Sequence, residues 1–355
     1  MSGFYSLPVS AITRETKDCV AISFDVPEKY KEIFQYLPGQ YLTLKLHVNG
    51  EEIRRSYSIC SSVQMNEKLT VAIKKVKDGK GSNFLNEKVK VGDNLEVMSP
   101  MGNFHTKLAS SNKKTYVLFA GGSGITPMMS ILKSALILEP QSKLILFYGN
   151  ENEASIIFNS ELIELAKTFT DRLEVIHVLN KPEVDHPADY TGIMNVEKNK
   201  FLLLKHSPKH NDVEYFICGP TGMMDSVVTA LNDLNVDKAK VHVEYFTAPV
   251  AAAPTATKDE FVSAELTVIC DGDEVQVKLS PEQSVLEAAL AAGLDAPYAC
   301  QGGSCCTCRA KLIEGKVHMK VNYALLESEV NEGFILTCQS HALSPTLVVD
   351  YDRGR

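Results

Sequence analysis

The sequence contains none of the segments that place a protein in or across a membrane. No apolar run approaches the ~20 residues that a membrane-spanning helix needs, and residues 1–18 have neither the basic start nor the apolar stretch of a signal peptide. We therefore expect a cytoplasmic protein with no membrane partner. Disulfide bonds are rare in that compartment, so clustered cysteines among the nine in the chain are expected to bind metal or to carry out redox chemistry.

An excess of basic residues is also missing, which argues against a nucleic-acid partner. The net charge of the 355-residue chain is −8. Residues 263–355 hold 7 Lys and Arg against 13 Asp and Glu, so a net charge of −6 lies in the last quarter of the chain. This pattern fits a module that docks on a basic face of a protein partner, and equally a solvated acidic surface.

The run TAPVAAAPTATKDE has no hydrophobic periodicity and consists largely of small residues and prolines, which predicts a linker. In the first 108 residues, short alternating stretches such as YLTLKLHV and LTVAIKKV predict antiparallel strands of a barrel or sandwich. Unbroken apolar strands then alternate with helices, which predicts a mostly parallel sheet covered on both faces. After the linker, a hairpin around Asp-Gly-Asp precedes a short helix. The expected domains are an antiparallel β-barrel at 1–108, an α/β domain at 109–246, the linker at 247–262 and an α+β domain at 263–355.

Four of the nine cysteines lie within nine positions, in the stretch CQGGSCCTC. Cys300, Cys305 and Cys308 have the spacing C-x4-C-x2-C, and Cys338 is the expected fourth partner. This is the plant-type [2Fe–2S] spacing, in which four thiolates hold two irons. Cys306 is the surplus thiol and is expected to face away from the irons. The alternative is a zinc site, although such sites usually bring two C-x2-C pairs and this chain has one.

The last 93 residues resemble a plant-type ferredoxin domain, which has a β-grasp fold. The resemblance covers the hairpin, the helix, the three-cysteine loop and the distant fourth cysteine. It departs from many members of that family at Cys306, where they have glycine. The resemblance implies a [2Fe–2S] cluster with four metal ligands, Cys300, Cys305, Cys308 and Cys338.

The segment RRSYSICSS contains the pattern Arg-x-Tyr-Ser, whose chemistry suits a flavin. Arg55 can neutralise a diphosphate, Tyr57 offers a flat face for a ring, and the hydroxyl of Ser58 can donate to flavin N5. The alternative is an ordinary strand with an outward-facing arginine. Further along, DGKGSNFL opens a short helix, with N–H groups that suit a phosphate.

Together these segments resemble the flavin domain of the ferredoxin–NADP reductase superfamily. The resemblance implies an FAD-binding barrel, with FMN as the alternative. The residues that it assigns to flavin binding are Arg55, Ser56, Tyr57, Ser58, Ile73, Lys74, Gly79, Gly81, Ser82 and Asn83.

The segment YVLFAGGSGITPMMSIL predicts a strand that runs through glycines into a helix beginning at Thr126 and Pro127. Glycines at such a turn let backbone approach a pyrophosphate at the positive end of the helix. The segment is not the G-x-G-x-x-G of dehydrogenases, but it matches the G-G-x-G-I-T-P of the same superfamily, as CGPTGM matches its C-G-P-x-x-M. For Cys218 alone, a buried inert thiol would be the simpler interpretation. The resemblance assigns nicotinamide binding to Gly121, Gly122, Ser123, Gly124, Thr126, Pro127, Cys218, Gly219, Pro220 and Met223.

Two further expectations rest on the ends of strands. In VHVEYF, Glu244 is expected to stabilise or relay charge near the flavin, and an aromatic residue, Phe246 or its neighbour Tyr245, to cover the ring, although a simple terminal strand fits equally well. In LFYGNENEASIIF, Glu151 and Glu153 occupy the turn where relatives that accept NADPH generally place Arg, Lys or Ser. Carboxylates there would repel the 2′-phosphate of NADPH, so we expect a preference for NADH.

The order of flavin, nicotinamide and ferredoxin domains resembles the reductase components of bacterial oxygenases. The segments RRSYSICS and CCTCRAKLIEGKV are most similar to the phenylacetyl-CoA epoxidase type of this family. The resemblance implies hydride transfer from NADH to flavin beside Ser58 and Cys218, with Glu244 near, and then single electrons passing through the cluster to an oxygenase partner. Alternatives are the reductase of a Rieske-type or steroid hydroxylase, a stand-alone oxidoreductase that reduces a small acceptor, and a zinc-binding adaptor.

Overall fold

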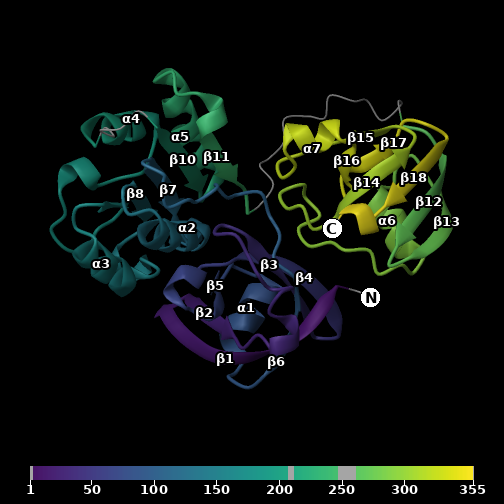
Figure 1. Cartoon of the computed structure of the whole chain (residues 1–355), viewed down its shortest axis with the longest axis horizontal. Coiled ribbons are helices and arrows are strands. Elements are labelled where there is room, and N and C mark those ends of the chain that lie inside the picture. Colours follow the sequence, from purple (N-terminus) through teal and green to yellow (C-terminus); the bar gives the residue numbers. More distant parts are fainter. Residues whose placement is uncertain (1–2, 207–211, 247–260, 355) are drawn as a thin grey trace.

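A computed structural model describes residues 3–206, 212–246 and 261–354, which form three units along the chain (Figure 1). Most of the expected linker, residues 247–260, lies outside the described residues. Within the described ranges, none of the helices has the length and hydropathy that a membrane crossing demands. The three expected fold classes, an antiparallel barrel, a parallel α/β sheet and an α+β ferredoxin domain, are confirmed.

The first unit is an antiparallel barrel with strand order β4-β3-β6-β1-β2-β5. A bridge between Ile59 and Val71 joins the ends of this sheet. Alternate residues of a strand share a face, and Leu42, Leu44 and Leu46 of β3 accordingly lie in the barrel core. The elements are β1 (Phe4–Thr16), β2 (Cys19–Phe24), β3 (Tyr41–Val48), β4 (Glu51–Ser58), β5 (Leu69–Lys74), α1 (Lys80–Glu87) and β6 (Asn94–Met98).

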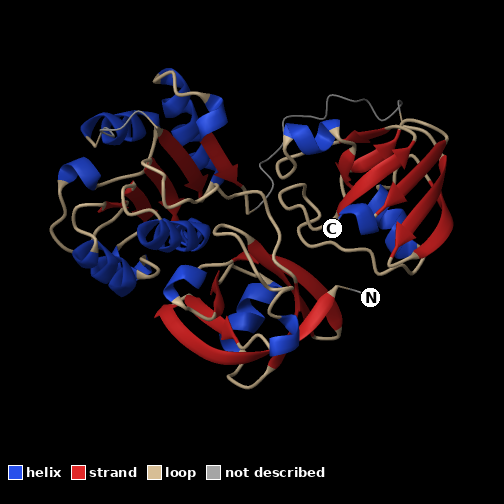
Figure 2. Cartoon of the chain, in the orientation of Figure 1, coloured by secondary structure: helices blue, strands red, loops and turns tan. Residues whose placement is uncertain are grey.

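The second unit is a five-stranded, fully parallel sheet with order β11-β10-β7-β8-β9. Helices α2 and α3 pack on one face together with part of the barrel, and α4 and α5 pack on the other (Figure 2). The carboxyl ends of the strands therefore meet at one edge, where such sheets bind ligands. The elements are β7 (Thr115–Gly121), α2 (Ile125–Leu138), β8 (Lys143–Asn150), α3 (Asn159–Thr168), β9 (Leu173–Leu179), α4 (Val196–Lys205), β10 (Val213–Cys218), α5 (Thr221–Asp233) and β11 (Val241–Glu244).

The third unit is a mixed sheet of order β13-β12-β18-β14-β16, packed against α6. The expected hairpin turns at Asp271 and Gly272, which both have positive φ, the backbone that a two-residue hairpin loop requires. Ser284 and Glu287 form a capping box that starts α6. The elements are β12 (Ala264–Cys270), β13 (Asp273–Leu279), α6 (Val285–Ala291), β14 (Arg309–Glu314), β15 (Val317–Met319), α7 (Glu327–Asn331), β16 (Phe334–Leu336), β17 (Ser340–Ala342) and β18 (Thr346–Asp350).

Candidate redox site

The Arg-x-Tyr-Ser segment forms the end of β4, at the edge of the barrel. Ser58 is its last residue and is buried, and its hydroxyl donates to Oε2 of Glu244 at 3.2 Å. Glu244 ends β11 of the second unit, so this hydrogen bond joins the flavin motif to the edge of the parallel sheet. Arg55 is exposed and Tyr57 is half-buried, which leaves the guanidinium accessible to an anionic ligand.

The glycine-rich start of α1 lies beside this strand. A Cβ built on Gly81 would lie 3.6 Å from the hydroxyl oxygen of Tyr57, so the backbone is close to the expected flavin site. The Oγ of Ser82 accepts from the N–H of Val76 at 3.1 Å and donates to the carbonyl of Gly79 at 3.3 Å. Ser82 therefore shapes the loop, and a phosphate here would rely on backbone N–H groups. The other expected flavin residues, Ser56, Ile73, Lys74 and Asn83, lie on β4, β5 and α1, which pack together.

The two expected nicotinamide loops touch through their backbones. A Cβ on Gly124 would lie 2.0 Å from the carbonyl oxygen of Cys218, and one on Gly121 would lie 2.6 Å from Cδ of Pro220. A Cβ on Gly219 would lie 2.9 Å from the nitrogen of Gly121. Glycine is therefore required at these positions, because any side chain would force the two loops apart.

Helix α2 begins at Ile125, one residue before the expected start. Pro127 is thus the third helical residue, still within the first turn, where a missing N–H breaks no intrahelical bond. The hydroxyl of Thr126 donates to the carbonyl of Ser123 at 3.0 Å and closes the preceding turn. Of the remaining expected residues, Gly122 has a positive φ of 51°, and Met223 of α5 packs on Gly121.

Cys218 is fully buried at the end of β10, where it is paired in parallel register with Ala120 and Glu244. Burial, followed by the nearby Glu244 carboxylate, holds the pKa of the Cys218 thiol well above its usual value. The residue is therefore a neutral thiol at neutral pH. It is not a thiolate nucleophile.

Glu244 is half-buried, and loss of hydration raises the pKa of its carboxyl from 4.5 to about 8 despite the hydrogen bond from Ser58. The carboxyl is therefore mostly protonated at neutral pH, which suits a group that exchanges protons. Tyr245 turns away toward the third unit, where its ring lies 5.2 Å from that of Tyr323. Phe246 is 40% exposed, which leaves its ring accessible.

The two acidic residues after β8 differ in how their charge is compensated. Glu151 forms an ion pair with Lys181 at 2.8 Å and accepts from the amide of Asn180, and these contacts lower its pKa. Glu153 accepts from the backbone N–H of Glu183 at 2.9 Å, which lowers its pKa too. An N–H group carries no net charge, so the negative charge of Glu153 persists while that of Glu151 is offset by Lys181.

The four expected cluster ligands form two close pairs. The thiol of Cys305 and backbone N–H groups lower the pKa of Cys300 to about 6. In the second pair, Cys308 favours the thiolate of Cys338, whose pKa is lowered. Two thiols for each metal fit a binuclear cluster held by four cysteines.

The surroundings of these thiols also fit a cluster. The N–H of Gly302 lies 3.4 Å from Sγ of Cys300, and the amide of Gln339 lies 3.6 Å from Sγ of Cys338. Donors that point at sulfur are the usual partners of iron–sulfur ligands. Among the described residues, no three His, Cys, Asp or Glu side chains are grouped closely enough to hold one metal ion.

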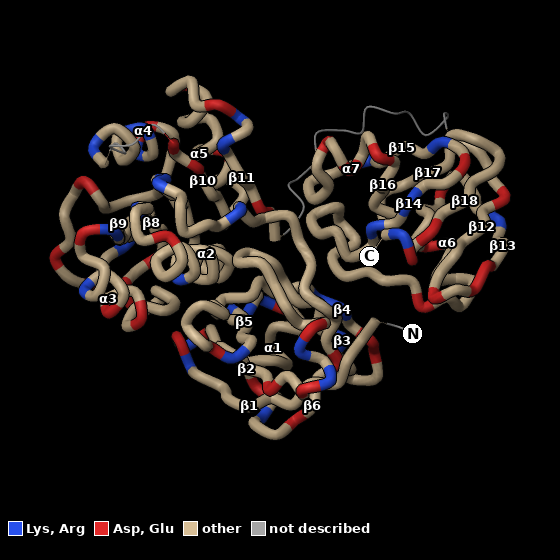
Figure 3. The backbone as a smooth tube through the Cα atoms, in the orientation of Figure 1, with Lys and Arg blue, Asp and Glu red and all other residues tan. Residues whose placement is uncertain are grey.

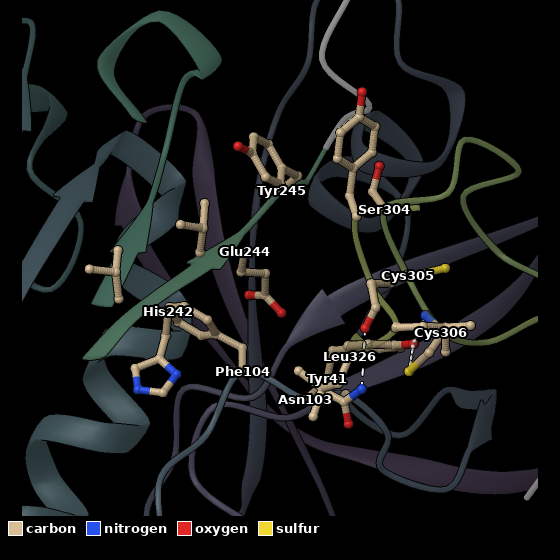
Figure 4. Close-up of a pocket in the computed structure, with 16 residues that line it drawn as sticks. Tyr41, Asn103, Phe104, His242, Glu244, Tyr245, Ser304, Cys305, Cys306 and Leu326 are labelled. Carbon is tan, nitrogen blue, oxygen red and sulfur yellow. Dashed lines mark hydrogen bonds between the residues drawn. The ribbon is translucent and has the colours of Figure 1, made fainter. Parts of the chain in front are cut away.

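A cavity of about 160 Å³ lies where the three units meet. Figure 4 shows Glu244 on one side of it and Cys305 and Cys306 on the other, with Tyr41 and Phe104 below. The cavity therefore connects the carboxyl that is bonded to Ser58 with the cysteine loop. Of the expected site residues, Glu244 and Cys305 line this cavity, and Ser58 is joined to it through its hydrogen bond to Glu244.

Sequence reasoning missed two residues at this junction. Tyr41 of β3 contacts Cys306 and Thr307 through its hydroxyl, and Arg54 of β4 binds Asp295. Tyr41 is the first residue of an ordinary alternating strand, YLTLKLHV, so nothing in the local sequence marked it as an interdomain contact. Arg54 directly precedes Arg55 of the flavin motif. Because adjacent residues of a strand face opposite sides, the role expected for Arg55 gave no indication of what Arg54 contacts.

Comparison with known proteins supports this arrangement. Family models match residues 6–106 as an oxidoreductase FAD-binding domain, residues 118–229 as an oxidoreductase NAD-binding domain and residues 268–343 as a 2Fe–2S iron–sulfur cluster binding domain. The chain is 37% identical to a subunit of the 1,2-phenylacetyl-CoA epoxidase of Escherichia coli (strain K12), over 99% of both chains. It is 35% identical to the ferredoxin reductase component of 3-ketosteroid-9-alpha-monooxygenase of Rhodococcus rhodochrous, over 97% of this chain and 96% of that one.

Solved structures show the same fold at lower identity. Phthalate dioxygenase reductase matches with a TM-score of 0.56 and 23% identity, covering 98% of each chain. An intact type IV self-sufficient cytochrome P450 monooxygenase matches with a TM-score of 0.71 and 21% identity. This chain is covered over 98% of its length but spans only 41% of that longer protein.

The chain belongs to the family of oxygenase reductase components that join an FAD-binding domain, an NAD-binding domain and a ferredoxin domain. It is an NAD(P)H-dependent oxidoreductase that transfers electrons through FAD and a [2Fe–2S] cluster. The expected family, fold and cofactors are thereby confirmed.

Proposed function

We propose that this protein takes electrons from NADH and delivers them singly to the oxygenase component of a phenylacetyl-CoA epoxidase. The proposal for the partner rests on the 37% identity to a component of such an epoxidase over nearly the full length of both chains. The reductase of a 3-ketosteroid monooxygenase is the second candidate, supported by 35% identity. When bound, FAD would supply a two-electron hydride acceptor and the cluster a one-electron carrier, so together they would allow conversion of two-electron into one-electron transfer.

The observation that carries the mechanism is the hydrogen bond between Ser58 and Glu244 beside the cysteine loop. We assign to Ser58 the hydrogen bond to the flavin ring, and to Arg55 the neutralisation of the flavin diphosphate. Glu244 holds a proton at neutral pH and can exchange it at this position. The backbone of the glycine loops would hold the nicotinamide nucleotide, with the neutral thiol of Cys218 against its ring.

The charge of the ferredoxin domain supports docking on a basic face of the partner. Residues 263–355 carry a net charge of −6, and acidic residues lie on several strands and loops of this domain (Figure 3). Complementary charges chiefly speed encounter, and salt screens that effect. We therefore expect the rate of oxygenase reduction to fall as salt concentration rises.

The test is anaerobic reduction of the purified holoprotein by NADH, followed by addition of a purified oxygenase component. We expect reduction of flavin, then of the cluster, then product formation from phenylacetyl-CoA by the epoxidase oxygenase. Product formation only with a 3-ketosteroid oxygenase would favour the second candidate. Two results together would indicate a stand-alone oxidoreductase: full turnover of a small acceptor by a variant that lacks the cluster, and no electron transfer from the wild-type holoprotein to either oxygenase.

A further inference from the structure

A buried tyrosine of the flavin domain holds the cysteine loop of the ferredoxin domain. The hydroxyl of Tyr41 accepts from the backbone N–H of Cys306 at 3.0 Å and lies 3.3 Å from its Sγ. The same hydroxyl lies 3.2 Å from Oγ1 of Thr307. Tyr41 is only 5% exposed, so these contacts lie in a closed interface, visible beside the cavity in Figure 4.

A chain of hydroxyl groups continues from this contact into the flavin motif. Oγ1 of Thr43 lies 3.2 Å from Oγ1 of Thr307 and 3.2 Å from Oγ of Ser56. Thr43 and Tyr41 share one face of β3, because alternate residues of a strand point the same way. Ser56 belongs to the Arg-x-Tyr-Ser segment, and Thr307 lies next to the cluster ligand Cys308. The interface thus joins the two cofactor-binding segments directly.

Arg54 forms a second point of attachment on the neighbouring strand. Its side chain is 5% exposed and makes an ion pair with Asp295 of the ferredoxin domain. It also donates to the carbonyl of Ala296 at 3.3 Å, and its guanidinium lies 4.5 Å from the ring centre of Tyr298. A buried guanidinium is costly unless it is paired and hydrogen-bonded. One ion pair, with Glu52 at 2.7 Å, lies within the flavin domain, whereas the contacts with Asp295, Ala296 and Tyr298 cross the domain boundary. The side chain is therefore committed to the docked position of the ferredoxin domain.

We propose that Tyr41 and Arg54 are positioning residues that fix the cysteine loop against the flavin domain for flavin-to-cluster electron transfer. The proposal rests on the electron-transfer function argued above. The proposal also accounts for Cys306, the cysteine that is not an expected cluster ligand. Its thiol faces the hydroxyl of Tyr41, and its backbone N–H donates to that hydroxyl. Electron transfer slows steeply with distance. Tyr41 holds the cysteine loop itself and Arg54 holds residues 295–298, which lead into it, so together they would keep the transfer distance short.

The test compares Tyr41→Phe, Arg54→Met and the double variant with wild-type holoprotein. Tyr41→Phe removes only the hydroxyl, and Arg54→Met keeps much of the apolar stem while leaving the 43%-exposed Asp295 in contact with water. Tyr36→Phe is the matched control, because its hydroxyl bonds to Ser61 within the flavin domain at 2.9 Å. Flavin and iron contents equal to wild type establish that each variant is loaded.

Anaerobic stopped-flow absorbance with NADH separates the two steps. We expect wild-type flavin reduction in every variant, and cluster reduction slowed by about threefold or more in each single variant, since loss of one buried hydrogen bond changes an equilibrium by roughly that factor or more. The double variant should be slower still, and its small-angle X-ray scattering should show a larger radius of gyration. Tyr36→Phe should match wild type in both measurements.

Wild-type cluster reduction and scattering in the double variant would overturn the inference, while leaving the proposed function intact. A slowed flavin step of equal size would also overturn it, because the defect would then be general. Failure of the wild-type protein to reduce its cluster at all would instead refute the proposed function, and with it this inference.

Discussion

The packing of the two nicotinamide loops predicts a large effect from one methyl group. A Cβ on Gly124 would lie 2.0 Å from the carbonyl oxygen and 2.4 Å from the carbonyl carbon of Cys218. Non-bonded atoms need about 3 Å, so Gly124→Ala must separate the loop from the end of β10 by about 1 Å. Gly124 has φ −61°, which any residue adopts, so the effect is purely steric.

The size of the effect follows from typical costs. Overpacking costs about 1–3 kcal/mol, which corresponds to a fall in Tm of roughly 2–12 °C for a domain of this size. A displacement of about 1 Å in a site that positions reactants can slow reaction on the order of 100-fold. We therefore expect the kcat/KM of flavin reduction by NADH to fall by about that factor in Gly124→Ala, with flavin retained.

Gly222→Ala is the matched control. Gly222 lies in the same nicotinamide segment, as the second residue of α5, and a Cβ there meets nothing within 4 Å. Alanine in a helix is favoured over glycine by about 0.5–1 kcal/mol, so this variant should keep wild-type kinetics and a Tm at or above wild type. Wild-type Tm and flavin reduction rate in Gly124→Ala would refute the steric argument.

Three further predictions concern the other parts of the site. Cys338→Ala should abolish the electron paramagnetic resonance signal of the reduced cluster, whereas Cys306→Ala should retain it; the reverse result would reassign the ligand. Glu153→Gln should raise the ratio of kcat/KM for NADPH to that for NADH. The increase should be larger than in Glu151→Gln, because the charge of Glu151 is already offset by Lys181. The same ratio in both variants would contradict this prediction. Burial raises the pKa of Glu244 from 4.5 to about 8 in the folded protein, so the stability that its protonation contributes is present at low pH and is lost as the pH rises. The Tm of the flavin-free wild type should therefore fall relative to that of Glu244→Gln between pH 4.5 and about 8, and the difference should be constant at higher pH. Parallel curves would exclude this effect.

Local chemistry made much of the site predictable from sequence. The cysteine spacing lies within one short segment that must hold a metal cluster. The glycines lie within two short segments that must bring their backbones close to a ligand. The cysteine spacing predicted four thiolates that hold two irons, and the glycine segments predicted a backbone that can approach a pyrophosphate at a helix start. Helix α4 has no clear periodic signal in the sequence, because Phe201 and the leucines after it form a continuous apolar run. Its cap was readable, since the side chain of Asn195 accepts from the N–H of Lys198 at 2.9 Å.

What the sequence left open is how the domains face one another. Tyr41 and Cys306 are 265 positions apart, and Arg54 and Asp295 are 241 apart, so no local pattern links them. The flavin motif drew attention to Arg55, yet its neighbour Arg54 makes the interdomain ion pair because the two side chains leave β4 on opposite faces. Cofactor identity is thus encoded within segments of about ten residues. The separation of the cofactors, on which the transfer rate depends, is instead encoded in pairs that become meaningful only once both domains have folded.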